Sequence, residues 1–271
     1  MSGAVEAIVA HETPHGDIQV VTRCAQILRL FSATRRSLRI AEVAEALALR
    51  RTTAHRYLTS MANADVLERG GDGSFVLGPL ILQLGVAALR GVRVLEVAGP
   101  FMQRLADETS ETVVLAVWGG LGPVVGLVQE SSTRLVHISV RVGSPLPLEA
   151  AQSLVFLAFL ANRSVERRLL TQLTDVHRRE IQQQVIATRR NGFASNAAVF
   201  QGIRALAVPV FDGQGEICAT LAVIGSVMTV PADPSNLLAA LMRMTEQLSR
   251  ELGCTQAMPF KMPVLISESV S

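Results

Sequence analysis

The feature that most constrains this chain is a pair of short helical patterns separated by three residues. The first pattern repeats at the i, i+3, i+4, i+7 spacing of one apolar helix face, on Ile40, Val43, Ala44 and Leu47. The second covers about 51–64, and another helical pattern precedes both at 18–32. A Gly-Gly-Asp-Gly turn at 70–73 then separates two short strand candidates, which is a hairpin signal. Three helices and a hairpin predict a winged helix-turn-helix domain at 18–78.

The third of these helices carries two different faces. Its apolar arc consists of Ala54, Tyr57, Leu58 and Met61, when residues are spaced at about 100°. The opposite arc consists of Thr52, Arg56, Thr59 and Asn63, with Thr53 and Ser60 beside it. Short hydroxyl side chains let a helix approach the major groove closely, and their hydroxyls bond to phosphates or base edges. This face therefore predicts a recognition helix for double-stranded DNA.

Individual contacts follow from the chemistry of each side chain. Arg56 can bond a guanine with two parallel hydrogen bonds, and Arg50 and Arg51 lie at the helix N-terminus, where the backbone dipole also favours phosphate. Arg69, on the wing, is expected at the flanking DNA backbone. His55 borders the apolar arc, so it is either half-buried or a phosphate contact. The predicted DNA-binding residues are Arg50, Arg51, Thr52, Thr53, His55, Arg56, Thr59 and Arg69.

The distribution of charge favours the same end of the chain. Residues 20–78 contain nine arginines against five acidic residues, whereas residues 99–253 contain thirteen of each. The positive excess therefore coincides with the predicted DNA-binding domain, where arginine suits phosphate and guanine contacts.

The rest of the chain divides into further segments. Residues 1–17 show no period and are expected to form a flexible arm. A linker helix is predicted at 79–98, from its stripe of Leu80, Leu84, Ala87, Gly91 and Leu95. Such a stripe packs against something, either its copy in a homodimer or its own domain.

A second domain is predicted at 99–253, with a loosely ordered tail at 254–271. It begins with a helix at 101–109 and ends with a helix at 235–252. Between them, a helical block at 149–190 separates strand patterns, and glycine-rich turns mark hairpins on both sides of that block. The predicted strands cover 112–118, 124–129, 135–140, 206–211 and 217–224. The expected fold is therefore α+β, with an antiparallel-rich sheet covered by helices.

Several classes of protein are disfavoured. The longest apolar run, Leu154–Ala161, is far shorter than a membrane helix, and the N-terminus lacks a signal-peptide pattern. The three cysteines are far apart with no CxxC pair, and the one pair of histidines at i, i+4, His11 and His15, lies in the predicted flexible arm. No GxSxG, Walker A or GxGxxG motif occurs. We therefore expect a cytoplasmic protein that is not an enzyme and uses no metal or other cofactor.

The same residues resemble a known family. The run Arg51-Thr52-Thr53-Ala54-His55-Arg56-Tyr57-Leu58, followed by Leu67-Glu68-Arg69 and by Phe75-Val76-Leu77-Gly78-Pro79, is similar to the IclR family of bacterial transcriptional regulators. Further similarity lies in 106–113, 141–147, 192–194, 202–204 and 207–210, so the resemblance covers about 18–253. It implies a winged helix, a dimerising linker helix and a GAF-like effector domain. It also implies homodimers, often assembled into homotetramers, on palindromic operators.

Two departures from the family pattern lie in the DNA-binding domain. Ala41 stands where the second helix usually opens with Ser or Thr, which predicts a lost N-cap. Ala48 stands where the turn usually has glycine, so it must adopt a positive φ or a different turn.

The effector domain departs further, because alanine or an apolar residue replaces several polar ones. A carboxylate buried without donors is unfavourable by several kcal/mol. We therefore expect an unidentified small-molecule effector that is more apolar or aromatic than a small oxoacid. The pocket candidates are Trp118, Leu127, Leu146, Ala151, Gln152, Ser153, Ser195, Ala205, Ala222 and Ile224. Two alternatives stay open: a ligand-independent regulator with a filled pocket, and a winged-helix module that binds protein.

Overall fold

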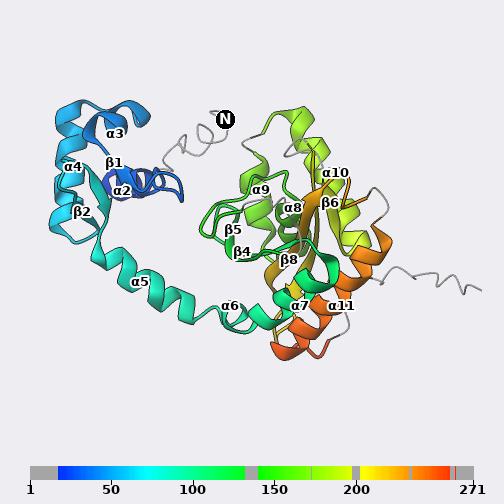
Figure 1. The fold of residues 1–271 in the computed structure, drawn as a ribbon. Coiled ribbons are helices and arrows are strands. Elements are labelled where there is room, and N and C mark those ends of the chain that lie inside the picture. The colour runs from blue at the N-terminus through cyan, green and yellow to red at the C-terminus, as the bar shows by residue number, and fades with distance from the viewer. Residues whose placement is uncertain are drawn as a thin grey trace, which may run out of the picture. The chain divides into compact units, whose positions relative to one another are not determined.

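The computed structural model describes residues 18–131, 140–171, 173–196, 202–231, 234–256 and 260. The chain divides into two compact units, Met1–Val92 and Arg93–Ser271 (Figure 1). The predicted arm at 1–17 and most of the predicted tail at 254–271 lie outside the described residues. Within the described ranges, no helix combines the length and the apolar character needed to cross a membrane.

The first unit is the predicted winged helix-turn-helix. Its helices are α2 (Gln19–Leu28), α3 (Ile40–Ala46) and α4 (Arg51–Asn63), and its strands are β1 (Ser37–Leu38), β2 (Leu67–Arg69) and β3 (Phe75–Leu77). The strands form an antiparallel sheet in the order β1-β3-β2. One core joins all six elements through the buried residues Ile27, Leu38, Val43, Ala54, Leu58, Leu67 and Phe75.

The turn between α3 and α4 confirms the expectation for Ala48. This residue adopts φ +50°, in the left-handed region that an alanine adopts only at a cost. The backbone N–H of Leu49 then donates to the carbonyl of Ala44 at 2.8 Å. The turn therefore keeps its backbone path without a glycine, at the cost of local strain.

The expectation for Ala41 was wrong in its position. α3 begins at Ile40 and its N-cap is Arg39, so Ala41 lies inside the first turn. The carboxylate of Glu42 accepts the backbone N–H of Arg39 at 2.7 Å. Glu42 thus supplies the hydrogen bond at this helix start, and Ala41 does not remove a cap.

The predicted linker helix is interrupted. α5 (Pro79–Arg90) begins at its proline as expected, but Gly91 is its C-cap and a separate helix, α6 (Arg93–Val97), follows. Hydrogen bonds of the i→i−3 type end α5, because the Gly91 N–H donates to the Ala88 carbonyl and the Val92 N–H donates to the Leu89 carbonyl. The boundary between the two units lies directly after this turn.

The second unit contains an antiparallel sheet with the strand order β5-β4-β8-β7-β6. Its strands are β4 (Thr112–Trp118), β5 (Pro123–Gln129), β6 (Ala194–Asn196), β7 (Ile203–Phe211) and β8 (Ile217–Ser226). Its further helices are α7 (Gly99–Thr109), α8 (Ala151–Phe159), α9 (Arg163–Leu170), α10 (Asp175–Asn191) and α11 (Ser235–Glu251). The expected α+β fold with an antiparallel sheet is confirmed.

Helix α8 packs on one face of this sheet. A row of small residues, Ala194, Ala207 and Ala222, crosses β6, β7 and β8 in direct register, and all three pack in one cluster with α8. Small side chains let a helix approach the sheet closely. Accordingly, eight of the nine residues of α8 are buried between the sheet and α10. α7 and α11 contact each other and the same sheet.

Some predicted elements need adjustment. The helical block at 149–190 consists of three helices, β6 was not predicted, and β7 begins three residues earlier than expected. The predicted strand at 135–140 lies outside the described residues except for Val140, which is not in a strand. In the predicted tail, Cys254 is buried and Phe260 lies against Phe159, with ring centroids 5.7 Å apart.

Candidate nucleic-acid interface

Helix α4 buries one side and presents the other to solvent. Ala54, Leu58 and Met61 are buried in the core of the winged helix, which fixes the rotation of the helix about its axis. Thr52 and Arg56 are exposed on the opposite side, and His55 is exposed at the border of the buried side. The two arcs predicted from the sequence are therefore real, and the hydroxyl and guanidinium row of Thr52 and Arg56 is available to a partner.

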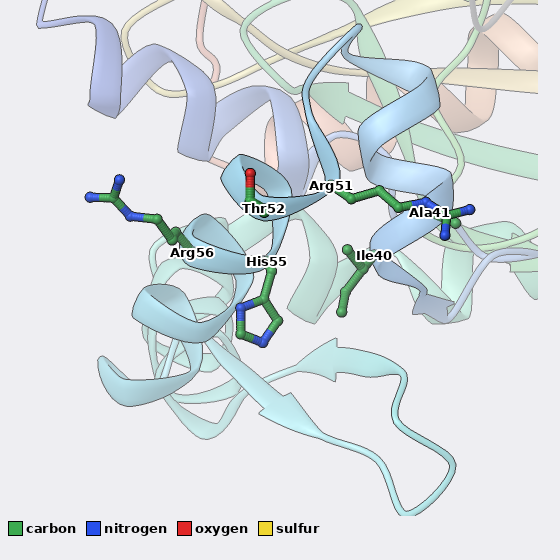
Figure 2. A pocket seen from close by; sticks show the side chains of 6 residues that line it. All are labelled: Ile40, Ala41, Arg51, Thr52, His55 and Arg56. Carbon is green, nitrogen blue, oxygen red and sulfur yellow. The ribbon is translucent and has the colours of Figure 1, made fainter.

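An open hollow of about 590 Å³ lies between the first turns of α3 and α4. In Figure 2, Arg51 extends across it toward Ala41, while Arg56 points away from α3. The lining combines two aliphatic side chains, one hydroxyl side chain and three side chains that carry or can carry positive charge: Ile40, Ala41, Thr52, Arg51, His55 and Arg56. Such a surface can bind phosphate through its cations and a base edge through its short side chains.

The remaining predicted residues at the start of α4 differ in exposure. Arg50 is the N-cap and Arg51 the first helical residue, and both side chains are exposed. Thr53 is half-buried, so its side chain is less accessible to DNA than the exposed side chain of Thr52. His55 is exposed, which removes the alternative of a half-buried histidine.

Arg69 lies on the wing, at the end of β2, and is exposed as expected, but its side chain also has partners within the protein. Its Nη2 donates to the Thr59 hydroxyl at 3.0 Å, and its guanidinium lies 5.5 Å from the Phe75 ring centroid. The wing is thereby joined to the recognition helix, and two predicted DNA contacts are joined to each other. This pairing was missed because Thr59 and Arg69 belong to different elements, and no sequence period relates them.

A second arginine holds the tip of the wing. Arg39 Nη2 lies 3.0 Å from the Asp72 carboxylate. The pKa of Asp72 lies below its ordinary value, because Ser74 donates hydrogen bonds from its side chain and backbone, and Arg39 adds a positive charge. The acidic residue at the wing tip is therefore ionised and paired at neutral pH.

The second unit brings together part of the predicted effector pocket. Trp118, Ala151, Ala205 and Ala222 all pack in or against the α8 cluster, and Trp118 lies 5.4 Å from the Phe156 ring. Ile224 lies on the same face, two residues along β8 from Ala222. Trp118, the single tryptophan of the sequence, is half-buried and so still partly in contact with solvent. A ligand that displaced this solvent would alter the fluorescence of Trp118.

Two polar candidates are engaged within the protein. The Gln152 side chain is buried and its Nε2 donates to the Val114 carbonyl at 3.2 Å, the Thr220 carbonyl at 3.2 Å and the Thr220 hydroxyl at 3.1 Å. The buried Ser153 hydroxyl donates to the Pro147 carbonyl at 2.7 Å. These groups join α8 to the sheet and to the preceding loop.

Three other candidates lie outside this arrangement. Leu127 pairs with Leu115 and Ser195 with Leu206, and alternation along a strand places both on the face opposite Ala222. Ser195 is also exposed. Leu146 is half-buried, with its backbone N–H on the Pro123 carbonyl at 2.9 Å. The strand register, which the sequence does not specify, accounts for the misplacement of Leu127 and Ser195.

Within the described part of the chain, no three residues among His, Cys, Asp and Glu lie close enough together to hold a metal ion.

Family models match both units. The model described as the IclR helix-turn-helix domain matches residues 20–71, and the bacterial transcriptional regulator IclR C-terminal model matches residues 86–250. The transcriptional repressor IclR of Escherichia coli is 26% identical over 236 residues, which cover 83% of this chain and 86% of the repressor.

Solved structures show the same fold. An IclR family transcriptional regulator from Brucella abortus superposes with a TM-score of 0.72 at 20% identity, covering 93% of this chain and 100% of that one. An IclR homologue from Microbacterium hydrocarbonoxydans, complexed with 4-hydroxybenzoate, gives a TM-score of 0.67 at 22% identity, covering 86% and 98%.

Proposed function

Since the chain belongs to the IclR family of bacterial transcriptional regulators, and is thus a DNA-binding regulator, we propose that α4 reads the major groove of its operator. Arg56 bonds a guanine through two hydrogen bonds, and Thr52 contacts the adjacent base edge or phosphate. Arg50, Arg51 and His55 contact phosphates near the N-terminus of the helix. No catalytic role is assigned to any residue.

One observation carries this proposal: α4 buries Ala54, Leu58 and Met61 and so exposes Thr52 and Arg56 as a row beside a cationic hollow. A helix that binds DNA needs its short polar side chains outward and its apolar side fixed to the domain. A protein-binding module would instead be expected to expose apolar residues on this face.

The test compares two arginine variants of the full chain on operator and unrelated duplexes. Arg56→Ala should weaken operator binding by about 1–3 kcal/mol and relax the preference at one base position. Arg51→Ala should weaken binding to all sequences alike and lower the salt slope by about one. If Arg56→Ala instead weakened every duplex equally, Arg56 would be a phosphate contact and not a base reader.

The proposed regulator acts as a homodimer on a palindromic operator. None of the residues of α5 is buried in the single chain, and Leu82, Leu84 and Leu89 are 70%, 58% and 54% exposed. Pairing of two α5 helices through the side that carries Leu82 and Leu89 would cover these two leucines and fix the distance between two recognition helices. Half-sites would then be spaced by about one helical turn of DNA or a related distance. Assembly of two such dimers would give a homotetramer.

The proposed effector is a small apolar or aromatic molecule bound on the α8 side of the sheet, at the half-buried side chains of Trp118, Ala205 and Ile224 that border the buried Ala222. Alanines and an indole ring provide apolar contacts, and the donors of Gln152 and Ser153 are already used. An effector that prefers one conformation of this unit shifts the population competent to bind the operator. The 4-hydroxybenzoate complex of the Microbacterium homologue is consistent with this class of ligand.

A second candidate is a regulator that binds no effector. The observation in its favour is the same packing, since α8 is almost wholly buried and Gln152 is held by three acceptors. Calorimetric titration of the full chain with hydroxylated benzoates, glyoxylate and pyruvate separates the two. Binding of an aromatic supports the first candidate, tight binding of the oxoacids rules out an apolar effector, and no binding by any compound favours the second.

A further inference from the structure

The base-reading row of α4 does not end at Arg56. Thr52, Arg56 and Thr59 stand at i, i+4 and i+7, so they share one face of the helix. Thr59 differs from Thr52 in that it is half-buried and its hydroxyl already has a protein partner, the guanidinium of Arg69. Any role of Thr59 toward DNA therefore depends on what this partner leaves free.

The chemistry of the pair fixes the direction of the Thr59 hydroxyl. A guanidinium has only donors, so the Thr59 oxygen accepts in the 3.0 Å hydrogen bond from Arg69 Nη2. One of the two lone pairs of the oxygen is thus occupied and the hydroxyl hydrogen must point away from Arg69, so the direction in which Thr59 can donate is constrained. Without Arg69, the same hydroxyl could rotate and serve as donor or acceptor.

Arg69 is itself held in place from the wing. Its guanidinium lies over the ring of Phe75, at 5.5 Å from the centroid, and Phe75 is buried in the core of the domain. A planar guanidinium over an aromatic ring loses less freedom on forming a hydrogen bond than a free side chain does. By contrast, the side chain of Arg51, on α4, makes no hydrogen bond or ion pair within the described part of the chain.

We propose that Arg69 is a positioning residue that sets one base preference of the operator through Thr59, without contacting DNA itself. The held hydroxyl donates to an acceptor in the major groove, which is N7 or O6 of guanine, N7 of adenine or O4 of thymine. Cytosine, whose amino donor could meet only the one lone pair that Arg69 leaves free and which offers no acceptor to the hydroxyl hydrogen, is disfavoured. This inference rests on the proposed function of α4 and specifies a further position of its site.

The test selects bound duplexes from a random pool with the full chain and its Arg69→Ala, Thr59→Val and Thr59→Ser variants. We expect Arg69→Ala and Thr59→Val to relax the same base position, from about tenfold discrimination against cytosine to about twofold. Thr59→Ser keeps the hydroxyl and should retain the preference. The double variant Arg69→Ala/Thr59→Val should lose no more than either single variant, because both changes remove one interaction.

The salt dependence of affinity distinguishes positioning from direct phosphate contact. Arg69→Ala should leave the salt slope unchanged, whereas Arg51→Ala should lower it by about one. A lower slope for Arg69→Ala, with equal weakening on every sequence, would show that Arg69 binds phosphate and would overturn the inference. Additive effects in the double variant, or unchanged selection by Thr59→Val, would overturn it as well.

The two levels of the proposal fail in different ways. If the unmodified chain selected no sequence at all, the proposed function and this inference would both fail. If it selected an operator and Arg56→Ala altered one position while Arg69→Ala and Thr59→Val altered none, only the role of Arg69 would fail. Thr59→Val and Thr59→Ser preserve side-chain shape or size, so they give a result even if Arg69→Ala does not fold.

Discussion

At the scale of single residues, Ala48 shows how this chain tolerates local strain at its DNA-binding turn. We expect Ala48→Gly to stabilise the first unit by about 1 kcal/mol, because glycine adopts φ +50° without the steric penalty of a Cβ. Denaturant unfolding followed through Tyr57, the single tyrosine of the sequence, measures this unit, while Trp118 follows the other.

The matched control for this change lies two residues earlier. Ala46 is the exposed last residue of α3, so Ala46→Gly should destabilise the same unit by about 0.5–1 kcal/mol. If both substitutions changed the free energy of unfolding in the same direction, the left-handed conformation of Ala48 would not be the cause of the change in Ala48→Gly.

Cys218 gives a pH dependence to the second unit. Burial, with a smaller contribution from the nearby Asp212 carboxylate, raises the pKa of the Cys218 thiol from 9.0 to about 12. Between these values the unfolded chain loses the proton and the folded chain keeps it, so the free energy of unfolding falls as pH rises. The slope is at most about 1.4 kcal/mol per pH unit.

Unfolding monitored through Trp118 at about pH 8 and about pH 10 measures this loss. In Cys218→Ala, the alkaline loss of stability should be smaller. An unchanged pH profile in that variant would assign the loss to other groups.

At the scale of whole elements, α5 is the clearest case of a helix that does not find its partner within one chain. Leu82 and Leu89 lie on one side of it and Leu84 on another, while Gln83 and Arg90 share a narrow polar strip. We expect Leu82→Glu/Leu89→Glu to convert a dimer into monomers, because pairing would bury two carboxylates, and to weaken operator binding at least tenfold.

Sedimentation of the full chain measures its association, and Gln83→Glu is the control on the polar strip. It adds negative charge to the same helix and should leave the dimer intact. A dimer that persisted in the double leucine variant would show that the two chains associate elsewhere.

Elements with a clear period were predictable from the sequence, and those fixed by tertiary contacts were not. The helices α3 and α4 carry strong one-sided apolar patterns, and the outward row of Thr52 and Arg56 follows from them directly. The short strand β6 exists only because it pairs with β7, so no local pattern marks it.

The candidate sites divide along the same line. The orientation of Arg56 depends on one helix and was predictable, whereas the contact of Arg69 with Thr59 depends on how the wing folds back onto that helix. Likewise, the hairpin pattern predicted β4 and β5 but not their register, which places Leu127 on the face opposite Ala222. The break between α5 and α6 could have been anticipated at Gly91, since glycine commonly ends helices.

At the scale of the whole molecule, the boundary after Val92 separates the element proposed to pair the DNA-binding domains from the unit proposed to bind an effector. α5 lies wholly on the DNA-binding side of this boundary. If pairing of α5 sets the distance between recognition helices, that distance should not depend on how the second unit is attached. Effector control, in contrast, needs a mechanical connection across the boundary.

Two insertions of the same length therefore should have opposite effects. Two alanines between Gly91 and Val92 should leave the preferred half-site spacing and the effector-free affinity unchanged, and should reduce the effect of a bound effector on operator affinity. Two alanines between Gly78 and Pro79 should change the preferred spacing, because they separate the winged helix from α5. Selection from duplexes with systematically varied spacing measures both. A changed spacing after the Gly91 insertion would place control of the half-site distance in the second unit, since only its attachment differs in that variant.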